Sequence, residues 1–296
     1  AKNTGKIIPA ELVRAKGGRR GSIVSKNNWV GPDGKVICTD RTSISFHKAF
    51  GGTFVSYTVT VHASEGDVTF GDTKEGSMGI RTHPNLRLTN GKGVTTANGH
   101  ALNSAGHKDK ELWGKRAKWV DYWGKIGDHT VGVAIFDHPD NLRHPTWWHA
   151  RDYGLIAANP FGIHNFEGKK KGVGDFKLKK GEEQQFRYGI LFHEGDAQAA
   201  DIVGSYAKWV EAVAAYKAKD VKRLLGDAGI IRNKLEVASI IKNAKRIQAL
   251  GDSHDGFAAW IAGHHPLNRA EWTKLFRQTF KFMGSEIVNE FMMCIG

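Results

Sequence analysis

One short stretch of the sequence gathers side chains that can do chemistry. Residues 137–162, DHPDNLRHPTWWHARDYGLIAANPFG, contain three histidines, two arginines and two adjacent tryptophans. Tryptophan rings can stack on the faces of sugars, while arginine, aspartate and asparagine can hydrogen-bond hydroxyl groups. Histidine transfers protons near neutral pH. The stretch therefore favours a site for a carbohydrate-like small molecule, but the same residues could also form a packed, hydrogen-bonded corner.

A metal site is the weaker interpretation of this stretch. His138, His144 and His149 are spaced by six and five residues, so no two of them form the i,i+4 pair of a helical metal motif. The two cysteines, Cys38 and Cys294, lie near opposite ends of the chain without a CxxC motif, so we expect free, buried thiols. The sequence predicts no metal and no cofactor.

The elements around the stretch have the patterns of β-strands. The apolar run Val131–Phe136 precedes it directly, so the polar residues begin at a strand end. Apolar and polar residues alternate over residues 55–62 and again over residues 186–192, as in half-buried strands. Turn dipeptides such as Asp33-Gly34 and Asn90-Gly91 separate such runs. These patterns predict an antiparallel β sandwich or barrel up to about Glu194.

The period changes to that of a helix after Asp196. Ile202, Val203, Tyr206, Val210 and Val213 would share one face of a helix, and a second helical pattern covers residues 237–247. The β pattern does not return after this point. We therefore expect a mainly β domain over residues 1–217 and an all-α segment over residues 218–296.

The composition is that of a folded, soluble protein. Of the 296 residues, 40% are apolar and 25% are charged, close to the averages for globular proteins. No run approaches the roughly 18 to 20 apolar residues of a membrane helix. Residues 1–10 lack the apolar core of a signal peptide, so the chain is either processed or a fragment, and its compartment is not indicated.

The formal net charge of +13 suggests contact with nucleic acid, because lysine and arginine neutralise phosphates. However, the residues from Asp220 onward contain 11 lysines and arginines against 8 acidic residues, so most of the excess lies in the β part. Some of it falls in residues 169–180, a glycine-spaced basic stretch that we expect to be a solvated loop.

Several separated motifs resemble the family known as PmoA-like. They are EGDVTFGDTKEG at residues 65–76, the Trp113-Gly114 pair, WVDY at residues 119–122, and the stretch 137–162 itself. The resemblance covers about residues 5–216 and implies a β-supersandwich of the galactose-mutarotase type. A His-rich segment of the DHPHH type is absent before Ala1, so we expect this copy to be truncated at its N-terminus. No membrane-oxidation chemistry is implied, because no spanning helix is present.

The mutarotase-type resemblance implies acid–base chemistry across a sugar ring. Its candidates for the general acid and base are His149, His144 and Glu75. The other side chains of the stretch would bind, orient or stack on the ligand, and they are His138, Arg143, Trp147, Trp148, Arg151, Asp152, Tyr153 and Asn159.

The C-terminal residues are similar to DNA-3-methyladenine glycosylase I. The similarity lies in DVKRLLGDAGIIRNKLEVASIIKNAKRIQAL at residues 220–250 and in the Trp272–Met292 stretch. That family uses a helix-hairpin-helix scaffold to flip and excise alkylated adenine, so the resemblance implies DNA repair. The hairpin could direct backbone amides at a DNA phosphate through Gly229, Ile230, Arg232, Asn233 and Lys234.

The glycosylase-like segment departs from its family in several ways. In that family, the active-site glutamate and half of the zinc ligands lie upstream of the matching stretch. In this chain the β domain occupies that position. Ile231 replaces a hairpin glycine, and Glu236 replaces a basic residue. We expect no glycosylase activity and at most weak duplex DNA contact, with the aromatic residues 280–291 in a core.

Three interpretations of function follow from the sequence. In the first, the β domain binds or transforms a carbohydrate-like ligand, and the C-terminal segment fused to it has no catalytic activity. In the second, the C-terminal segment makes the chain a base-excision repair or DNA-binding protein. In the third, the fusion is structural or artefactual and has no activity. The sequence does not decide whether the chain is an enzyme, and it predicts no membrane partner.

Overall fold

The computed structural model describes residues 4–91, 93–211, 242–243, 246–247, 250, 257–281, 283 and 288. The chain divides into two compact units, Ala1–Ala207 and Lys208–Gly296. The predicted domain boundary between residues 217 and 218 lies outside the described residues and stays a prediction.

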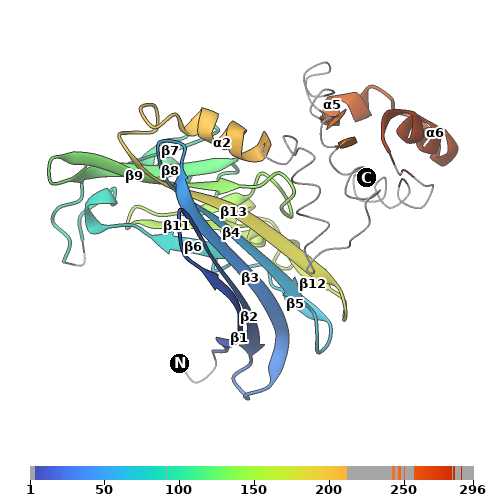
Figure 1. Cartoon of the computed structure of the whole chain (residues 1–296), viewed down its shortest axis with the longest axis horizontal. Coiled ribbons are helices and arrows are strands. Elements are labelled where there is room, and N and C mark those ends of the chain that lie inside the picture. The colour runs from blue at the N-terminus through green and yellow to red at the C-terminus, as the bar shows by residue number, and fades with distance from the viewer. Residues whose placement is uncertain are drawn as a thin grey trace. The chain divides into compact units, whose positions relative to one another are not determined.

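The first unit is built on one large antiparallel sheet (Figure 1). Its eight strands, in spatial order, are β1 (Lys6–Lys16), β2 (Arg20–Val30), β3 (Val36–Ala49), β4 (Gly52–His62), β13 (Glu183–Glu194), β9 (His129–Asp137), β8 (Trp119–Ile126) and β7 (His100–Asn103). The predicted strands at residues 55–62 and 186–192 are neighbours in this sheet, with Tyr57 opposite Tyr188. The mainly β fold is therefore confirmed.

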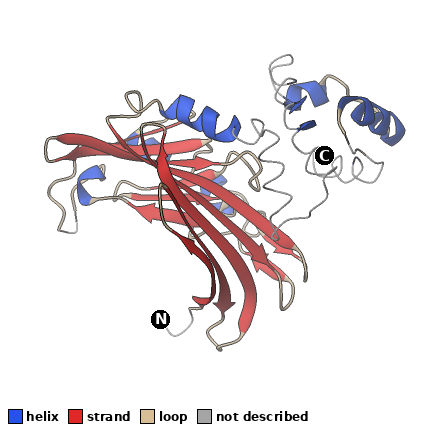
Figure 2. Ribbon diagram, viewed as in Figure 1, coloured by secondary structure: helices blue, strands red, loops and turns tan. Residues whose placement is uncertain are grey.

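Smaller elements complete the unit (Figure 2). A three-stranded sheet has the order β10 (Trp147–Ala150), β11 (Leu155–Asn159), β6 (Met78–Arg81), and a two-stranded sheet pairs β12 (Phe176–Leu178) with β5 (Val68–Phe70). The helical pieces are the 3-10 helices η1 (Pro84–Leu86) and η2 (Asp109–Leu112) and the α-helices α1 (Ile163–Glu167) and α2 (Ile202–Glu211).

The core lies between the large sheet and the three-stranded sheet. Tyr122, Ile135 and Tyr188 of the large sheet belong to one buried cluster with Trp148 and Ile156 of the small sheet. Side chains alternate along a strand, so residues of the same parity on each strand share this side of the large sheet. We call this side the inner face, and the opposite side the outer face.

Helix α2 packs on the outer face. The Tyr206 ring lies 5.6 Å from the Phe136 ring, which in turn lies 6.1 Å from Phe54. Ile202 is fully buried, as predicted, but Val203 is 68% exposed. The expectation that Val203 shares the buried face was wrong, because successive helical residues are rotated by about 100° and only one face of the helix reaches the sheet.

The second unit is helical in its described part, which contains α5 (Phe257–Ala262) and α6 (Arg269–Thr279). The Asn268 side chain accepts the backbone N–H groups of Ala270 and Glu271, and the Glu271 carboxylate accepts the Asn268 N–H in return. This reciprocal capping fixes the start of α6.

Aromatic side chains form the core of the second unit. Trp260, Trp272, Phe276 and Phe280 are all buried in one cluster. The predicted core role of Phe280 fits this packing. The predicted hairpin and its proposed DNA contacts at residues 229–234 lie outside the described residues, as does Cys294.

Cys38 is 1% exposed and free, as expected. Burial, with a further contribution from the charge of Asp40, raises the pKa of this thiol to about 11. Among the described residues, no helix combines the length and the apolar composition that crossing a membrane requires.

A buried polar pair crosses β9 on the outer face. His193 of β13 lies opposite Gly132 of β9, and Asp121 of β8 lies opposite Ala134. His193 Nε2 and Asp121 Oδ1 are nevertheless only 2.9 Å apart, and both side chains are at most 1% exposed. Glycine at 132 makes room for this contact, because a Cβ atom there would stand 2.5 Å from His193 Nε2.

We predict that Gly132→Ala destabilises the chain by about 1 to 3 kcal/mol, because the added methyl group forces His193 away from Asp121. Gly66→Ala is the control, since a Cβ atom at Gly66 meets nothing within 4 Å. Urea unfolding followed by circular dichroism measures both variants. Equal midpoints for the two variants would contradict the steric argument.

Candidate functional site

The predicted site residues lie at the two ends of the β10–β11 hairpin. Trp147 and Asn159 are paired at one end, close to the loop that follows β9. Arg151, Asp152 and Tyr153 form the turn at the other end, beyond the last pair, Ala150 with Ile156. The structure therefore separates the predicted residues into two groups.

The first group is organised by the carboxylate of Asp137, the last residue of β9. Its Oδ2 accepts from His144 Nδ1 at 2.7 Å and from the Thr146 backbone N–H at 3.0 Å. Its Oδ1 accepts from Asn141 Nδ2 at 2.7 Å. The side chain of Asp137 is 1% exposed and that of His144 is 15% exposed. The carboxylate thus fixes the orientation of the imidazole, which is the arrangement of a general base and its orienting group.

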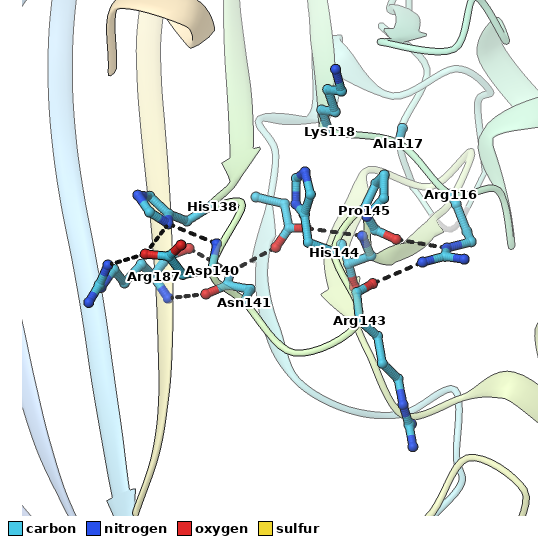
Figure 3. A network of polar contacts seen from close by, with 12 residues as sticks. Arg116, Ala117, Lys118, His138, Asp140, Asn141, Arg143, His144, Pro145 and Arg187 are labelled. Atoms are coloured by element: carbon cyan, nitrogen blue, oxygen red, sulfur yellow. Dashed lines mark hydrogen bonds and ion pairs between the residues drawn. The ribbon is translucent and has the colours of Figure 1, made fainter. Parts of the chain in front are cut away.

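His138 belongs to the same network, lies beside Asp140 and Arg187 (Figure 3) and is 7% exposed. Its Nδ1 accepts the Asp140 backbone N–H at 3.2 Å and lies 3.5 Å from the Asp140 carboxylate. Arg187 donates to that carboxylate at 2.8 Å. Burial lowers the pKa of His138, although the charge of Asp140 acts in the opposite direction. The net effect favours the neutral form of the imidazole.

Arg143 acts as a clamp for neighbouring loops. Its guanidinium donates to the carbonyl groups of Pro160 at 2.8 Å, Gly174 at 2.7 Å and Asp175 at 3.2 Å. Its own carbonyl accepts from Arg116 at 3.2 Å. These bonds to backbone groups hold the loop in place.

The two tryptophans are packed rather than open. Trp148 is fully buried and donates from Nε1 to the Ala117 carbonyl at 2.8 Å. Trp147 is 5% exposed, donates to Glu167 at 3.0 Å and carries the Arg116 guanidinium 4.5 Å from its ring centroid. This arrangement fits the packed corner that the sequence left open as an alternative, and a sugar-stacking role for either ring stays a prediction.

His149 and Asn159 are also engaged with the backbone. His149, 4% exposed, has Nδ1 2.9 Å from the Lys74 carbonyl, to which it donates. Asn159 donates to the Thr73 carbonyl at 2.8 Å and accepts the Phe161 N–H at 2.8 Å. Glu75 points to solvent, with its side chain 70% exposed. Within the described ranges, no three His, Cys, Asp or Glu side chains gather in a way that could hold a metal ion.

The second group, at the β10–β11 turn, is more accessible. Tyr153 is 37% exposed, and the guanidinium groups of Arg151 and Arg81 each lie 5.4 Å from its ring centroid. Asp152 faces Lys110 at 3.9 Å. Arg81 of β6 was not among the predicted residues, but it connects this turn to a nearby cavity.

A cavity of about 390 Å³ opens at this side of the unit. Its lining comes from the β3–β4 hairpin, the start of β9, the end of β13 and the segment after β6. The lining residues are Lys48, Gly51, Gly52, Thr53, Ile80, Arg81, Thr82, His83, Leu86, Ile126, Val131, Gly132, Val133, Phe192, His193 and Glu194. The volume lies within the range of small-molecule sites in proteins.

The cavity and the Asp137 network lie at opposite ends of β9. Val131 and Val133 line the cavity, while Asp137 stands four to six residues further along the strand. A strand rises about 3.3 Å per residue, so roughly 13 to 20 Å separates the two places. No ligand of a single sugar's size can contact both.

The sequence contained a signal for this cavity. Phe192 continues the buried alternation of Phe186, Tyr188 and Ile190, yet it is 48% exposed. Arg81 and Glu194 end β6 and β13. Polar residues at strand ends on a rigid sheet are common site positions, and these two ends meet at the cavity.

We predict that Asp137→Asn destabilises the chain by about 3 kcal/mol, because the new amide places a donor against the His144 or Thr146 donor in a buried site. Asp128→Asn is the matched control, because Asp128 is an exposed aspartate in the turn just before the same strand. Thermal unfolding of both variants measures the difference. A loss in Asp137→Asn no larger than in the control would show that the network is dispensable.

Comparisons with solved structures give only a weak likeness. A galactose mutarotase related enzyme from Lactobacillus acidophilus has a TM-score of 0.29 and 13% identity, over 62% of this chain and 70% of that chain. A galactose mutarotase-like protein from Lactobacillus casei has a TM-score of 0.27 and 9% identity, over 63% and 73%. Scores this low establish no shared fold.

The C-terminal part matches a different kind of protein. Residues 206–275 match the model for methyladenine glycosylase. DNA-3-methyladenine glycosylase 1 of Escherichia coli (strain K12) is 25% identical over 171 residues, covering 50% of this chain and 83% of that protein. Half of this chain is more than the residues from 206 to the end, so part of that alignment falls on strands of the β unit.

The family of the β unit follows from its own match. Residues 1–207, which include every strand described above, match the model of a family of unknown function. The name PmoA-like is not part of that match and stays a prediction. The chain belongs to this family of unknown function (DUF6807).

Proposed function

We propose that the β unit binds a carbohydrate-like small molecule in the cavity at the end of β13. The observation that carries the proposal is the exposed Phe192 ring beside hydrogen-bonding side chains in one concavity. A sugar presents an apolar face and a rim of hydroxyl groups, so it needs both an apolar wall and polar partners.

The apolar wall and the polar rim come from different elements. Ile80, Val131 and Val133 line the cavity with Phe192. Thr53 and Thr82 can donate to and accept from hydroxyl groups. Lys48 and Arg81 are donors, and Glu194 is an acceptor. Such a mixture can orient a polyhydroxylated ligand while excluding water from one of its faces.

His83 gives the cavity a group for proton transfer. Its Nδ1 accepts the Asn85 backbone N–H at 3.2 Å, so in the neutral ring Nε2 carries the proton. Glu194 supplies a carboxylate to the same cavity. If the unit transforms its ligand, these two residues are the proposed acid–base pair. The candidates His144, His149 and Glu75 do not line this cavity, so their catalytic role stays a separate prediction.

We predict that Phe192→Ala weakens the binding of a neutral monosaccharide about tenfold, because one buried sugar face loses its partner. Phe46→Ala is the control, since Phe46 is similarly exposed (41%, against 48% for Phe192) but does not line the cavity. Isothermal titration calorimetry with galactose and glucose measures the affinities. If neither sugar binds the native chain, or if both variants bind equally well, the proposal fails.

We propose weak duplex DNA contact as a second candidate function, located in the C-terminal unit. The match of residues 206–275 to methyladenine glycosylase favours it. Helix α6 adds support, because it exposes Arg269, Lys274 and Arg277. Basic side chains at exposed positions supply sequence-independent affinity for phosphates.

We predict that duplex affinity falls as salt rises, and that Arg232→Ala and Lys234→Ala each reduce the slope of log K against log salt by about 1. Lys35→Ala, an exposed lysine in the β2–β3 turn, should leave the slope unchanged. Fluorescence anisotropy with a labelled duplex provides the measurement. Binding without salt dependence, or no binding at 50 mM salt, would remove this function.

A further inference from the structure

Three arginines gather around the β10–β11 turn. Arg81 and Arg151 each hold their guanidinium group 5.4 Å from the centroid of the Tyr153 ring. Arg87 lies against the same turn, because a Cβ atom on Gly154 would stand 3.1 Å from Arg87 Cγ. The residues come from β6, from the segment after η1 and from the turn itself, so only the tertiary structure brings them together.

The backbone holds this arrangement in place. The Thr82 N–H donates to the Gly154 carbonyl at 2.8 Å, and the Leu88 N–H donates to the Asp152 carbonyl at 2.9 Å. Gly154 has a φ of +82°, a conformation that favours glycine. These two backbone hydrogen bonds join residues 81–88 to the turn. The backbone that carries the arginines is therefore held in place.

The positive charge of this arginine cluster, Arg81, Arg87 and Arg151, is not neutralised by the neighbouring chain. Among the described residues, none of the three forms an ion pair, and the turn's own carboxylate, Asp152, faces Lys110 at 3.9 Å. Like charges held together repel one another, which is costly unless an anion joins them.

Two buried polar atoms in the same place also lack partners in the described chain. They are Arg87 Nε and Thr82 Oγ1. A buried donor without an acceptor loses its hydration without compensation, and native structures rarely leave one in that state. Arg87 Nε is a donor of the arginine cluster itself and Thr82 Oγ1 lies beside it, so the cluster has hydrogen-bonding groups that the described chain leaves unsatisfied.

The cluster is continuous with the cavity. Arg81 and Thr82 line the cavity as well as the turn, and Lys48 and His83 line it nearby. Glu194 is the acidic side chain among the lining residues. The cavity is therefore basic on the side of the turn, where Arg81 lines it and Arg151 lies on the other side of the Tyr153 contact.

We infer that the ligand of the cavity is an anionic carbohydrate whose carboxylate or phosphate group is bound by Arg81, Arg87 and Arg151. This inference rests on the proposed carbohydrate-binding function. Guanidinium groups match the oxygens of both anions in a bidentate manner. The sugar ring then lies toward Phe192, with its hydroxyl groups near Thr53 and Glu194.

The experiment compares neutral and charged forms of one sugar on the full chain. Calorimetric titrations use glucose, glucuronate and glucose 6-phosphate, with inorganic phosphate as the anion alone. Either charged sugar is expected to bind about tenfold more tightly than glucose. The tighter of the two identifies the anion as a carboxylate or a phosphate.

Variants then test the arginine cluster. Arg151→Gln and Arg81→Gln should each bring the affinity ratio of charged to neutral sugar close to one. Arg151→Lys keeps the positive charge but loses the bidentate guanidinium group, so it should reduce this ratio only in part. Arg41→Gln is the control, because Arg41 is exposed and its parity in β3 places it on the outer face. Melting curves confirm that every variant is folded.

The outcomes separate this inference from the proposed function. Equal affinities for glucose and both charged sugars would overturn the anion site while leaving carbohydrate binding intact. Arginine-dependent binding of inorganic phosphate without binding of any sugar would support the anion site and reject carbohydrate binding. No binding of any of the four probes would reject both.

Discussion

The buried carboxylate of Asp137 is the interaction on which the organisation of the β unit depends. It stands at the end of β9, and it accepts hydrogen bonds from His144, Thr146 and Asn141. Its backbone carbonyl also accepts the Tyr206 hydroxyl of α2 at 3.2 Å. One residue therefore joins the large sheet to the following loop on one side and to the covering helix on the other. A charge buried this deeply is tolerated only because every donor around it is in place.

This use of polar groups explains why the residues richest in chemistry do not form an open pocket. The donors and acceptors of Arg143, Trp148, His149 and Asn159 are bound to backbone groups of neighbouring loops. A side chain whose hydrogen bonds are already made gains little by binding a ligand. Open space instead occurs at the other end of β9, where Phe192 extends beyond the packed core.

Local patterns were reliable where the period of the sequence matched a buried face. Alternation over residues 186–190 identified the core side of β13, and the apolar run Val131–Phe136 lies within β9. The helical period after Asp196 predicted α2, and Ile202 is buried, as this period predicted. The alternation failed at Phe192, which is 48% exposed, and the helical period failed at Val203, which lies on the side of α2 that faces away from the sheet.

The sequence by itself determined the mainly β class, the change to helices and the presence of an unusual polar stretch, because these depend on periods and residue types within short segments. Only the tertiary structure decided which polar groups face one another. Asp121 meets His193 across Gly132, 72 residues apart along the chain, and Arg81 meets Arg151 around the Tyr153 ring. Such contacts depend on strand order and register, which bring distant residues together and which no single segment encodes.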